Sequence, residues 1–149
     1  MNGVTLRALR EMVGMSVRDL ARLADVQERT IARWERGASP VPDDVARIVR
    51  DAKARQDEIV SFALAKYESI LDDLPDGEAL AVRLNYWTTE RDYLERSTDA
   101  ALGVDGDWLM ANATTRRVAA VLEDMGVAVS YTDDALPRPK PTTTLHLVD

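Results

Sequence analysis

The chain has 149 residues, 46% of them hydrophobic, which is enough for one ordinary domain or two small ones with a real core. It contains no cysteine, and this excludes disulfides and thiol chemistry. No apolar run reaches the length of a membrane span, and the N-terminus lacks a signal-peptide pattern. We therefore expect a cytoplasmic protein without a membrane partner.

The net charge of −7 is unevenly distributed along the chain. Residues 1–66 carry 12 Lys and Arg against 10 Asp and Glu, a net charge of +2. Residues 67–149 carry 7 against 16, a net charge of −9. Because attraction to phosphate depends on the local field rather than on the total charge, the first half can still bind a nucleic acid.

Three short helices are predicted in the first 37 residues. A stripe at helical spacing predicts the first of them and consists of Leu6, Leu9 and Val13. Ser16 followed by Asp19 fits a capping box, so the second helix begins there. Gly37 ends the third helix, because glycine adopts the left-handed conformation beyond a helix end without steric cost.

The third helix is predicted to have two different faces. When Ile31 points inward, Trp34 lies roughly 60° to one side and Glu35 roughly 40° to the other. Three arginines point roughly 140° to 200° away from Ile31, and they are Arg29, Arg33 and Arg36. Arginines on a helix surface are usually only a solvated face, whereas DNA binding is the functional interpretation.

The whole segment matches a longer pattern, G-x-S-x-x-x-L-A-x-x-x-x-V-x-x-x-T-I-x-x-W/I-E-x-G. The matching residues are Gly14, Ser16, Leu20, Ala21, Val26, Thr30, Ile31, Trp34, Glu35 and Gly37. The segment thus resembles the Cro and phage-repressor (XRE-type) class of helix-turn-helix proteins. The resemblance implies an internal ion pair between Arg10 and Glu35 and makes Trp34 a core residue.

Two positions depart from that class. Val17 stands where a glutamine often reaches a phosphate, so that contact requires Arg18 as a substitute. Asp25 stands at a turn position that is often glycine, and aspartate visits the left-handed region less readily.

A long amphipathic helix, or two in succession, is predicted after Pro40 and Pro42 and ends near Pro75 and Gly77. Its apolar stripe alternates spacings of three and four and consists of Val45, Val49, Ala52, Gln56, Ile59, Ala63, Tyr67, Ile70 and Leu74. Two interpretations stay open. The stripe packs only within its own domain, or part of it meets the same helix of a second subunit.

The last third of the chain changes period. Residues 80–87 alternate and predict a strand, with Leu80, Val82, Leu84 and Tyr86 on one side. Thr89 and Asp92 can cap a short helix to about Arg96, and residues 103–106 predict a loop. A helix is expected over 107–125, with Val118, Val121, Leu122 and Met125 inward and Gly126 as its stop. A second strand is expected over 127–131, and residues 136–149 are predicted to form an extended arm.

These elements predict a mainly α fold: an N-terminal helix-turn-helix bundle, a long following helix and a small C-terminal α+β dimerisation region. The expected domains are 1–74, 75–132 and an extended tail, 133–149. The order of W-E-x-G, V-P-D-D-V, a long helix, a strand and a late helix with Val118-Ala119-Ala120 resembles the anti-CRISPR-associated transcriptional regulators and their relatives. The resemblance implies homodimers formed through the C-terminal part and repression of the protein's own phage or mobile-element operon at an inverted repeat. Some members also bind RNA, and Arg29 matches an arginine of their recognition helix.

The expected partner is double-stranded DNA, and the candidate site residues lie on the second and third helices. Arg29 and Arg33 suit guanine, Glu28 suits cytosine N4, and Ala32 suits a thymine methyl group. The expected phosphate contacts are Ser16, Arg18, Gln27 and Arg36.

Two other functions remain as alternatives. An antitoxin-like module would use the acidic half to bind a basic protein. A carboxylate-dependent enzyme would hold a cation at Asp105 and Asp107, or at Asp72, Asp73 and Asp76. These acids lack EF-hand spacing, and the single histidine, His146, lies in the tail, so we expect no metal, no cofactor and no catalysis.

Overall fold

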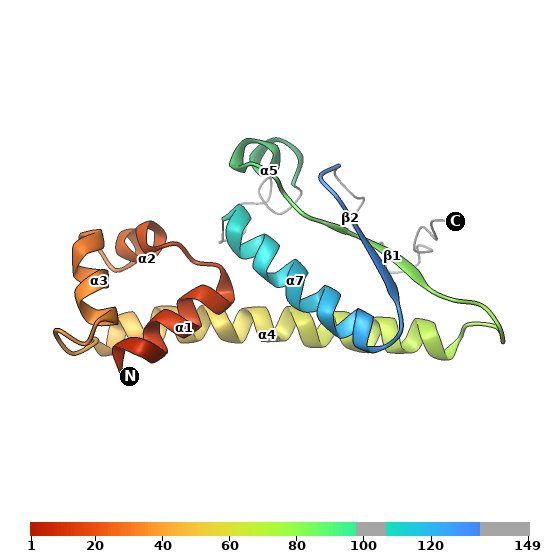
Figure 1. Cartoon of the computed structure of the whole chain (residues 1–149), viewed down its shortest axis with the longest axis horizontal. Helices are drawn as coiled ribbons and strands as arrows, with labels where there is room; N and C mark the ends of the chain where they lie inside the picture. Colours follow the sequence, from red (N-terminus) through yellow and green to blue (C-terminus); the bar gives the residue numbers. More distant parts are fainter. Residues whose placement is uncertain (98–106, 135–149) are drawn as a thin grey trace. The chain divides into compact units, whose positions relative to one another are not determined.

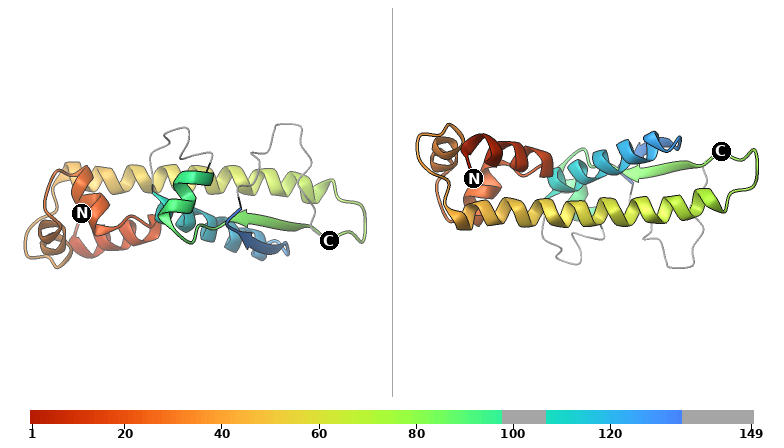
Figure 2. Two further views of the ribbon diagram at one scale, coloured as in Figure 1. Left: turned by 90° about the horizontal axis from the view of Figure 1, so that it is seen from above. Right: turned by 90° about the horizontal axis from the view of Figure 1, so that it is seen from below.

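The computed structural model describes residues 1–97 and 107–134 of the chain. These residues form six helices and one two-stranded parallel sheet, which confirms the predicted mainly helical fold with a small C-terminal sheet (Figure 1). The chain divides into two compact units, Met1–Ile59 and Val60–Asp149, and the division falls within one continuous helix, α4 (Asp43–Asp72; Figure 2). The expected domain borders after residues 74 and 132 stay predictions. No helix in the described ranges is both long enough and apolar enough to cross a membrane.

Unit 1 contains α1 (Gly3–Val13), α2 (Val17–Leu23), α3 (Glu28–Glu35) and the first part of α4. Its core is aliphatic and nearly inaccessible to solvent, with Leu6, Val13, Leu20, Ile31, Val45 and Val49 at 0–2% exposure. The predicted stripe of the first helix is confirmed at Leu6 and Val13, whereas Leu9 is half-buried. Gln56 is buried on α4 and donates to the carbonyl oxygen of Met12 at 3.2 Å, which joins α4 to the end of α1.

The helix ends and turns of unit 1 contain a capping serine and two residues in the left-handed conformation, Asp25 and Gly37. Ser16 caps α2 by accepting a hydrogen bond from the Asp19 amide at 3.0 Å, as predicted. Asp25, in the turn between α2 and α3, has φ 52°, so it adopts the left-handed conformation for which glycine is common. Gly37 has φ 73° directly after α3 and confirms the predicted stop.

Gly3 allows the start of α1 to lie directly against the end of α3. A Cβ atom at this position would lie 2.0 Å from the carbonyl oxygen of Trp34 and 2.8 Å from that of Glu35. Both neighbours are backbone atoms, so a rotamer change cannot relieve the overlap. The residue that permits this close approach carries no pattern of its own in the sequence.

Gly3→Ala should therefore destabilise the protein by about 1–3 kcal/mol, the usual cost of forcing extra volume into a packed site. Urea unfolding followed by circular dichroism measures the loss. The control is Val4→Ala, at a neighbouring side chain that is 75% exposed. An unchanged midpoint for Gly3→Ala would show that α1 and α3 can separate at no cost.

Unit 2 contains the rest of α4, β1 (Ala81–Asn85), α5 (Glu90–Arg96), α7 (Trp108–Asp124) and β2 (Ala128–Thr132). The strands pair in parallel, with Ala81 opposite Ala128 and Asn85 opposite Thr132. Helix α7 lies against both strands (Figure 1). The core combines α4, the strands and α7, and its buried members are Val60, Tyr67, Leu80, Val82, Val118, Leu122 and Val127. The predicted strands, the cap at Thr89 and the helix over 107–125 are confirmed within one or two residues.

Two positions differ from the predicted faces. Ile59 is 52% exposed, and Val60 takes its place in the core at 9%. A helix turns every 3.6 residues, so an alternating three-and-four spacing drifts around a straight helix, and the inward position after Gln56 comes four residues later rather than three. Trp87 is 5% exposed, whereas Tyr86 is only half-buried, because the extended strand has ended by then. The predicted loop at 103–106 and arm at 136–149 lie outside the described residues.

Asn112, buried on α7, holds the backbone that follows β1. Its side-chain amide accepts from the Trp87 N–H at 2.8 Å and donates to the Trp87 carbonyl at 2.7 Å. Thr115, on the same helix, donates its hydroxyl to the Asn85 carbonyl at 2.9 Å. A two-stranded sheet is marginal alone, and these bonds join its end to a helix instead of to a third strand.

Asn112→Ala should cost about 2–4 kcal/mol, since each buried backbone group left without a partner costs roughly 1–3 kcal/mol. The readout is thermal unfolding. Thr114→Ala, which removes a hydroxyl bonded only to the preceding turn of α7, is the control and should shift the midpoint much less. Equal shifts would mean that the Trp87 backbone finds other partners.

Candidate nucleic-acid interface

Helix α3 is held from behind by apolar side chains. Ile31 is fully buried and Trp34 is 8% exposed, which confirms both as core residues. A tryptophan that stacked on a nucleic-acid base would have to lie on the other side of the helix. The inner face of α3 therefore fixes which residues are left for a ligand.

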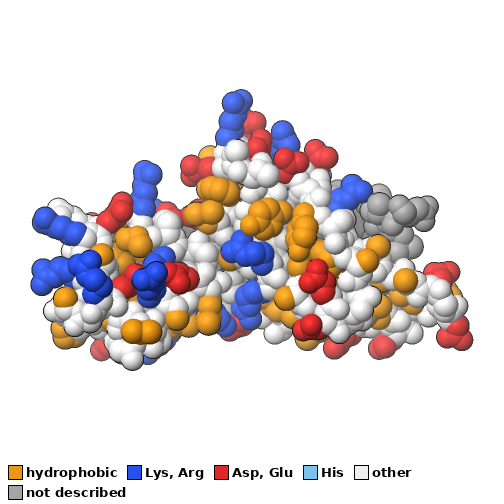
Figure 3. Space-filling model, in the orientation of Figure 1, with side chains coloured by type: hydrophobic (Ala, Val, Ile, Leu, Met, Phe, Trp, Pro, Cys, Tyr) orange, Lys and Arg blue, Asp and Glu red, His pale blue; other side chains and the backbone are white. Residues whose placement is uncertain are grey.

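The opposite side of α3 faces solvent and carries the predicted site residues. The exposed ones are Gln27, Glu28, Arg29, Arg33 and Arg36, and Ala32 is half-buried among them. Arg18 on α2 is also exposed, whereas Ser16 at its start is half-buried. Lys and Arg side chains gather over this part of unit 1 (Figure 3).

Helix α2 adds one cation that the sequence reasoning missed. Arg22 is exposed and lies four residues after Arg18, so the two share one side of α2. That spacing is visible in the sequence and could have identified it. With α3, the basic surface has five members: Arg18, Arg22, Arg29, Arg33 and Arg36.

None of these five guanidinium groups forms an ion pair or a hydrogen bond with another described residue. A guanidinium offers five N–H donors in a planar fork that fits phosphate, or the O6 and N7 atoms of guanine. Glu28, in the first turn of α3, is the acidic exception on this side. The basic surface thus consists of guanidinium N–H donors on α2 and α3 that have no partner among the described residues.

Ser16 and Gln27, the two predicted polar contacts to phosphate, differ in whether their side chains already form hydrogen bonds within the protein. The Ser16 hydroxyl accepts from the Asp19 amide and also donates to the Asp19 carboxylate, so it shapes the start of α2. Gln27 is the residue before α3, and its side chain makes no capping bond. The Gln27 amide remains available to a ligand, and a phosphate contact by either residue stays a prediction.

The ion pair that the resemblance implied between Arg10 and Glu35 is confirmed. Arg10 Nε lies 2.6 Å from Glu35 Oε1, and Nη2 lies 3.2 Å from Oε2. Arg10 Nη1 also donates to the Met15 carbonyl at 2.9 Å. Both side chains are about nine-tenths buried, so one guanidinium joins α1, the segment before α2 and the end of α3.

A second ion pair on α1 lies at the surface and differs from the buried pair. Arg7 Nε lies 2.7 Å from Glu11 Oε1, with both side chains more than half accessible to solvent. The hydrogen bond from Arg7 holds the pKa of Glu11 below its ordinary value. Solvent screens such a pair, so it contributes little to stability.

Arg10→Met should destabilise the protein by about 3–5 kcal/mol, because it leaves the Glu35 carboxylate buried without its cation. Arg7→Ala, at the exposed pair, should leave the unfolding midpoint unchanged. Chemical denaturation of Arg10→Met, of Glu35→Gln and of the double variant that combines them tests the coupling, with Arg7→Ala as the control. If the double change costs as much as the two single changes together, the pair contributes nothing as a pair.

The carboxylates considered for a cation do not form a cluster in the described part of the chain. No group of three or more His, Asp or Glu side chains within residues 1–97 and 107–134 is arranged so that it could hold a metal ion. Asp107 caps α7 by accepting from the Met110 amide at 2.8 Å. Asp105 lies outside the described residues.

Comparison with known families matches residues 1–120 to the Aca2/YdiL-like model. The chain belongs to the Aca2/YdiL-like family. The match spans the whole of unit 1 and reaches into α7. Membership relates the chain to anti-CRISPR-associated regulators and is consistent with a regulatory role. No curated protein matches the sequence.

Proposed function

We propose that this member of the Aca2/YdiL-like family is a sequence-specific DNA-binding regulator of transcription. The observation that carries the proposal is the two-sidedness of α3. Its inner side is fixed by Ile31, Trp34 and the Glu35 ion pair, while its outer arginines have no partner among the described residues. A rigid helix of this kind fits the major groove, which is about 12 Å wide.

In this proposal α2 and α3 act as a helix-turn-helix, and α3 is the recognition helix. Arg29 and Arg33 make bidentate contacts to guanine O6 and N7, and Glu28 accepts from cytosine N4. Ala32 contacts a thymine methyl group. Contacts to phosphate set the register, and they come from Ser16, Arg18, Gln27, Arg36 and the newly identified Arg22.

Regulation follows from a homodimer that places one α3 in each of two successive major grooves, about 34 Å apart. The operator is then an inverted repeat, and a dimer bound there blocks RNA polymerase. The family resemblance supports autorepression of a phage or mobile-element operon, and it makes RNA the second nucleic acid to test.

Arg33→Ala should lower the affinity for a footprinted operator by about 1–3 kcal/mol per half-site and relax specificity at one base pair. The measurement is a titration against operators substituted one base pair at a time. Arg91→Ala is the control, because it changes the net charge equally at a side chain 82% exposed on α5. Unchanged discrimination in Arg33→Ala would remove Arg33 from base recognition.

Arg22→Ala separates phosphate contact from base contact in the same titration. It should weaken binding to all substituted operators alike and reduce the slope of affinity against salt by about one. Failure of the unaltered protein to bind any DNA from the region around its own gene would overturn the proposed function.

A further inference from the structure

The turn between α2 and α3 contains a residue whose backbone conformation is unfavourable for its type. Asp25 has φ 52°, and within residues 1–97 and 107–134 it is the only residue other than glycine with a positive φ. The other residues with a positive φ are Gly14, Gly37, Gly77 and Gly126. A Cβ atom is strained in this left-handed region, whereas glycine adopts it freely. The turn thus keeps a carboxylate at a position where the chain elsewhere has glycine.

The side chain of Asp25 forms no bond that would offset this strain. Aspartate usually tolerates the left-handed region because its side chain can bond to the nearby backbone. Here Asp25 is exposed, and its carboxylate has no hydrogen bond or ion pair with any residue in the described ranges. The folded structure therefore gives the carboxylate no role, and strain without a structural reason points to a function.

Asp25 lies beside the basic surface, at the junction of the two helices that carry it. Its backbone N–H donates to the Arg22 carbonyl at 3.3 Å, which holds the residue over the last turn of α2. Arg29 follows four positions later in the first turn of α3. Both arginines are exposed and have no partner in the part of the chain that the structure describes. An unpaired carboxylate is thus placed next to guanidinium groups that are available to phosphate.

We infer that Asp25 limits the attraction of the basic surface for DNA phosphate, so that binding depends more on base contacts. The inference deepens the proposed function and rests on it for the identity of the ligand. For a phosphate about 8 Å away, the repulsion from one carboxylate changes binding roughly twofold at low salt. A duplex presents several phosphates to a surface of this kind, so the total effect is about two- to fivefold.

This limit matters most for DNA that is not the operator. Binding to random sequence comes almost entirely from attraction to phosphate. Weaker general attraction shortens the time that the protein spends on each such site, and these sites far outnumber the operator. Asp25 acts on DNA binding through its charge, without contacting a base.

Two substitutions separate the charge of Asp25 from its strain. Asp25→Asn removes the charge and keeps the size of the side chain, whereas Asp25→Gly removes both the charge and the strain. Both variants should bind a random-sequence duplex about two- to fivefold more tightly at low salt, and the gain should disappear at high salt because ions screen the repulsion. Fluorescence anisotropy of a labelled duplex at several salt concentrations measures this. Unchanged binding by Asp25→Asn would overturn the inference, even if Asp25→Gly binds more tightly.

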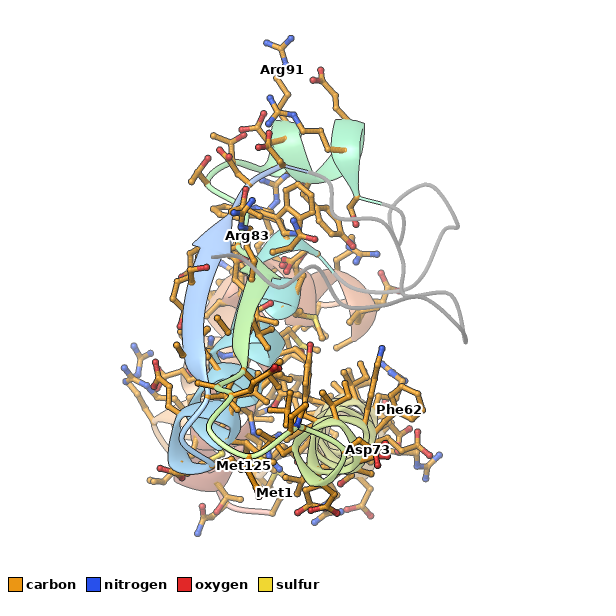
Figure 4. The ribbon with its side chains drawn as sticks, turned by 90° about the vertical axis from the view of Figure 1, so that its right-hand side faces the viewer. Met1, Phe62, Asp73, Arg83, Arg91 and Met125 are labelled. Atoms are coloured by element: carbon orange, nitrogen blue, oxygen red, sulfur yellow. The ribbon has the colours of Figure 1, made fainter. Side chains whose placement is uncertain are left out.

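The control for charge is Asp73→Asn, at an exposed carboxylate of unit 2. Figure 4 shows Asp73 at the end of α4, outside the unit that carries the basic surface. Its replacement should leave duplex binding unchanged. A gain equal to that of Asp25→Asn would mean that net charge sets the affinity wherever the charge lies, which would also overturn the inference.

Thermal unfolding measures the strain separately. Asp25→Gly should raise the midpoint by about 2–4 °C, because glycine adopts this conformation without a clash, and Asp25→Asn should raise it less. A midpoint that is lower in Asp25→Gly than in the unaltered protein would show that the aspartate stabilises the turn, and would contradict a purely electrostatic role.

Heparin chromatography separates a failure of this inference from a failure of the proposed function. Heparin is a polyanion without bases, so binding to it requires no reading of sequence, and Asp25→Asn should elute at higher salt than the unaltered protein. If the unaltered protein binds no operator while Asp25→Asn still elutes later, the proposed function fails and the effect of Asp25 on anion binding stands. If the operator is bound but the variant behaves like the unaltered protein on both heparin and random duplex, only the inference fails.

Discussion

The guanidinium of Arg10 joins three separate segments of unit 1, and its close carboxylate partner is Glu35, while the exposed carboxylate of Glu11 lies 3.8 Å away. A buried charge pair of this kind adds little net stability compared with apolar residues, but either member alone is costly. The main effect of the pair is therefore to specify one arrangement of α1 and α3, rather than to raise the free energy of unfolding. Gly3 has a related effect at the other end of α1, since only a residue without Cβ fits against the Trp34 carbonyl.

The orientation of the basic surface follows from this constraint. Once Glu35 and Trp34 face inward, helical geometry leaves Arg29, Arg33 and Arg36 on the outside. The net charge of −7 is not spread evenly along the chain, because the acidic excess lies in residues 67–149, after the helices that carry this surface. Under the proposed function, such a distribution makes affinity depend on a few placed donors rather than on general attraction, which suits the recognition of one operator.

Unit 2 shows how a very small sheet is stabilised. Apolar side chains of its two parallel strands pack against α4 and α7. Asn112 and Thr115 of α7 form hydrogen bonds with the backbone at the end of β1 and just after it. Polar anchoring of this kind is needed where a sheet has few strands and short ladders.

Local patterns in the sequence determined most of the elements and the candidate site. The capping box at Ser16, the stop at Gly37 and the phase of Ile31 against the arginines depend on neighbours within four residues, and such short-range chemistry is readable from the chain. Only the tertiary structure decided the facts that depend on distant backbone: the close approach at Gly3, the clamp of Asn112 on Trp87, and the parallel pairing of the strands. It also decided that Val60 rather than Ile59 is buried, because the sequence alone does not show at which residue a drifting apolar stripe moves out of the core of a long helix.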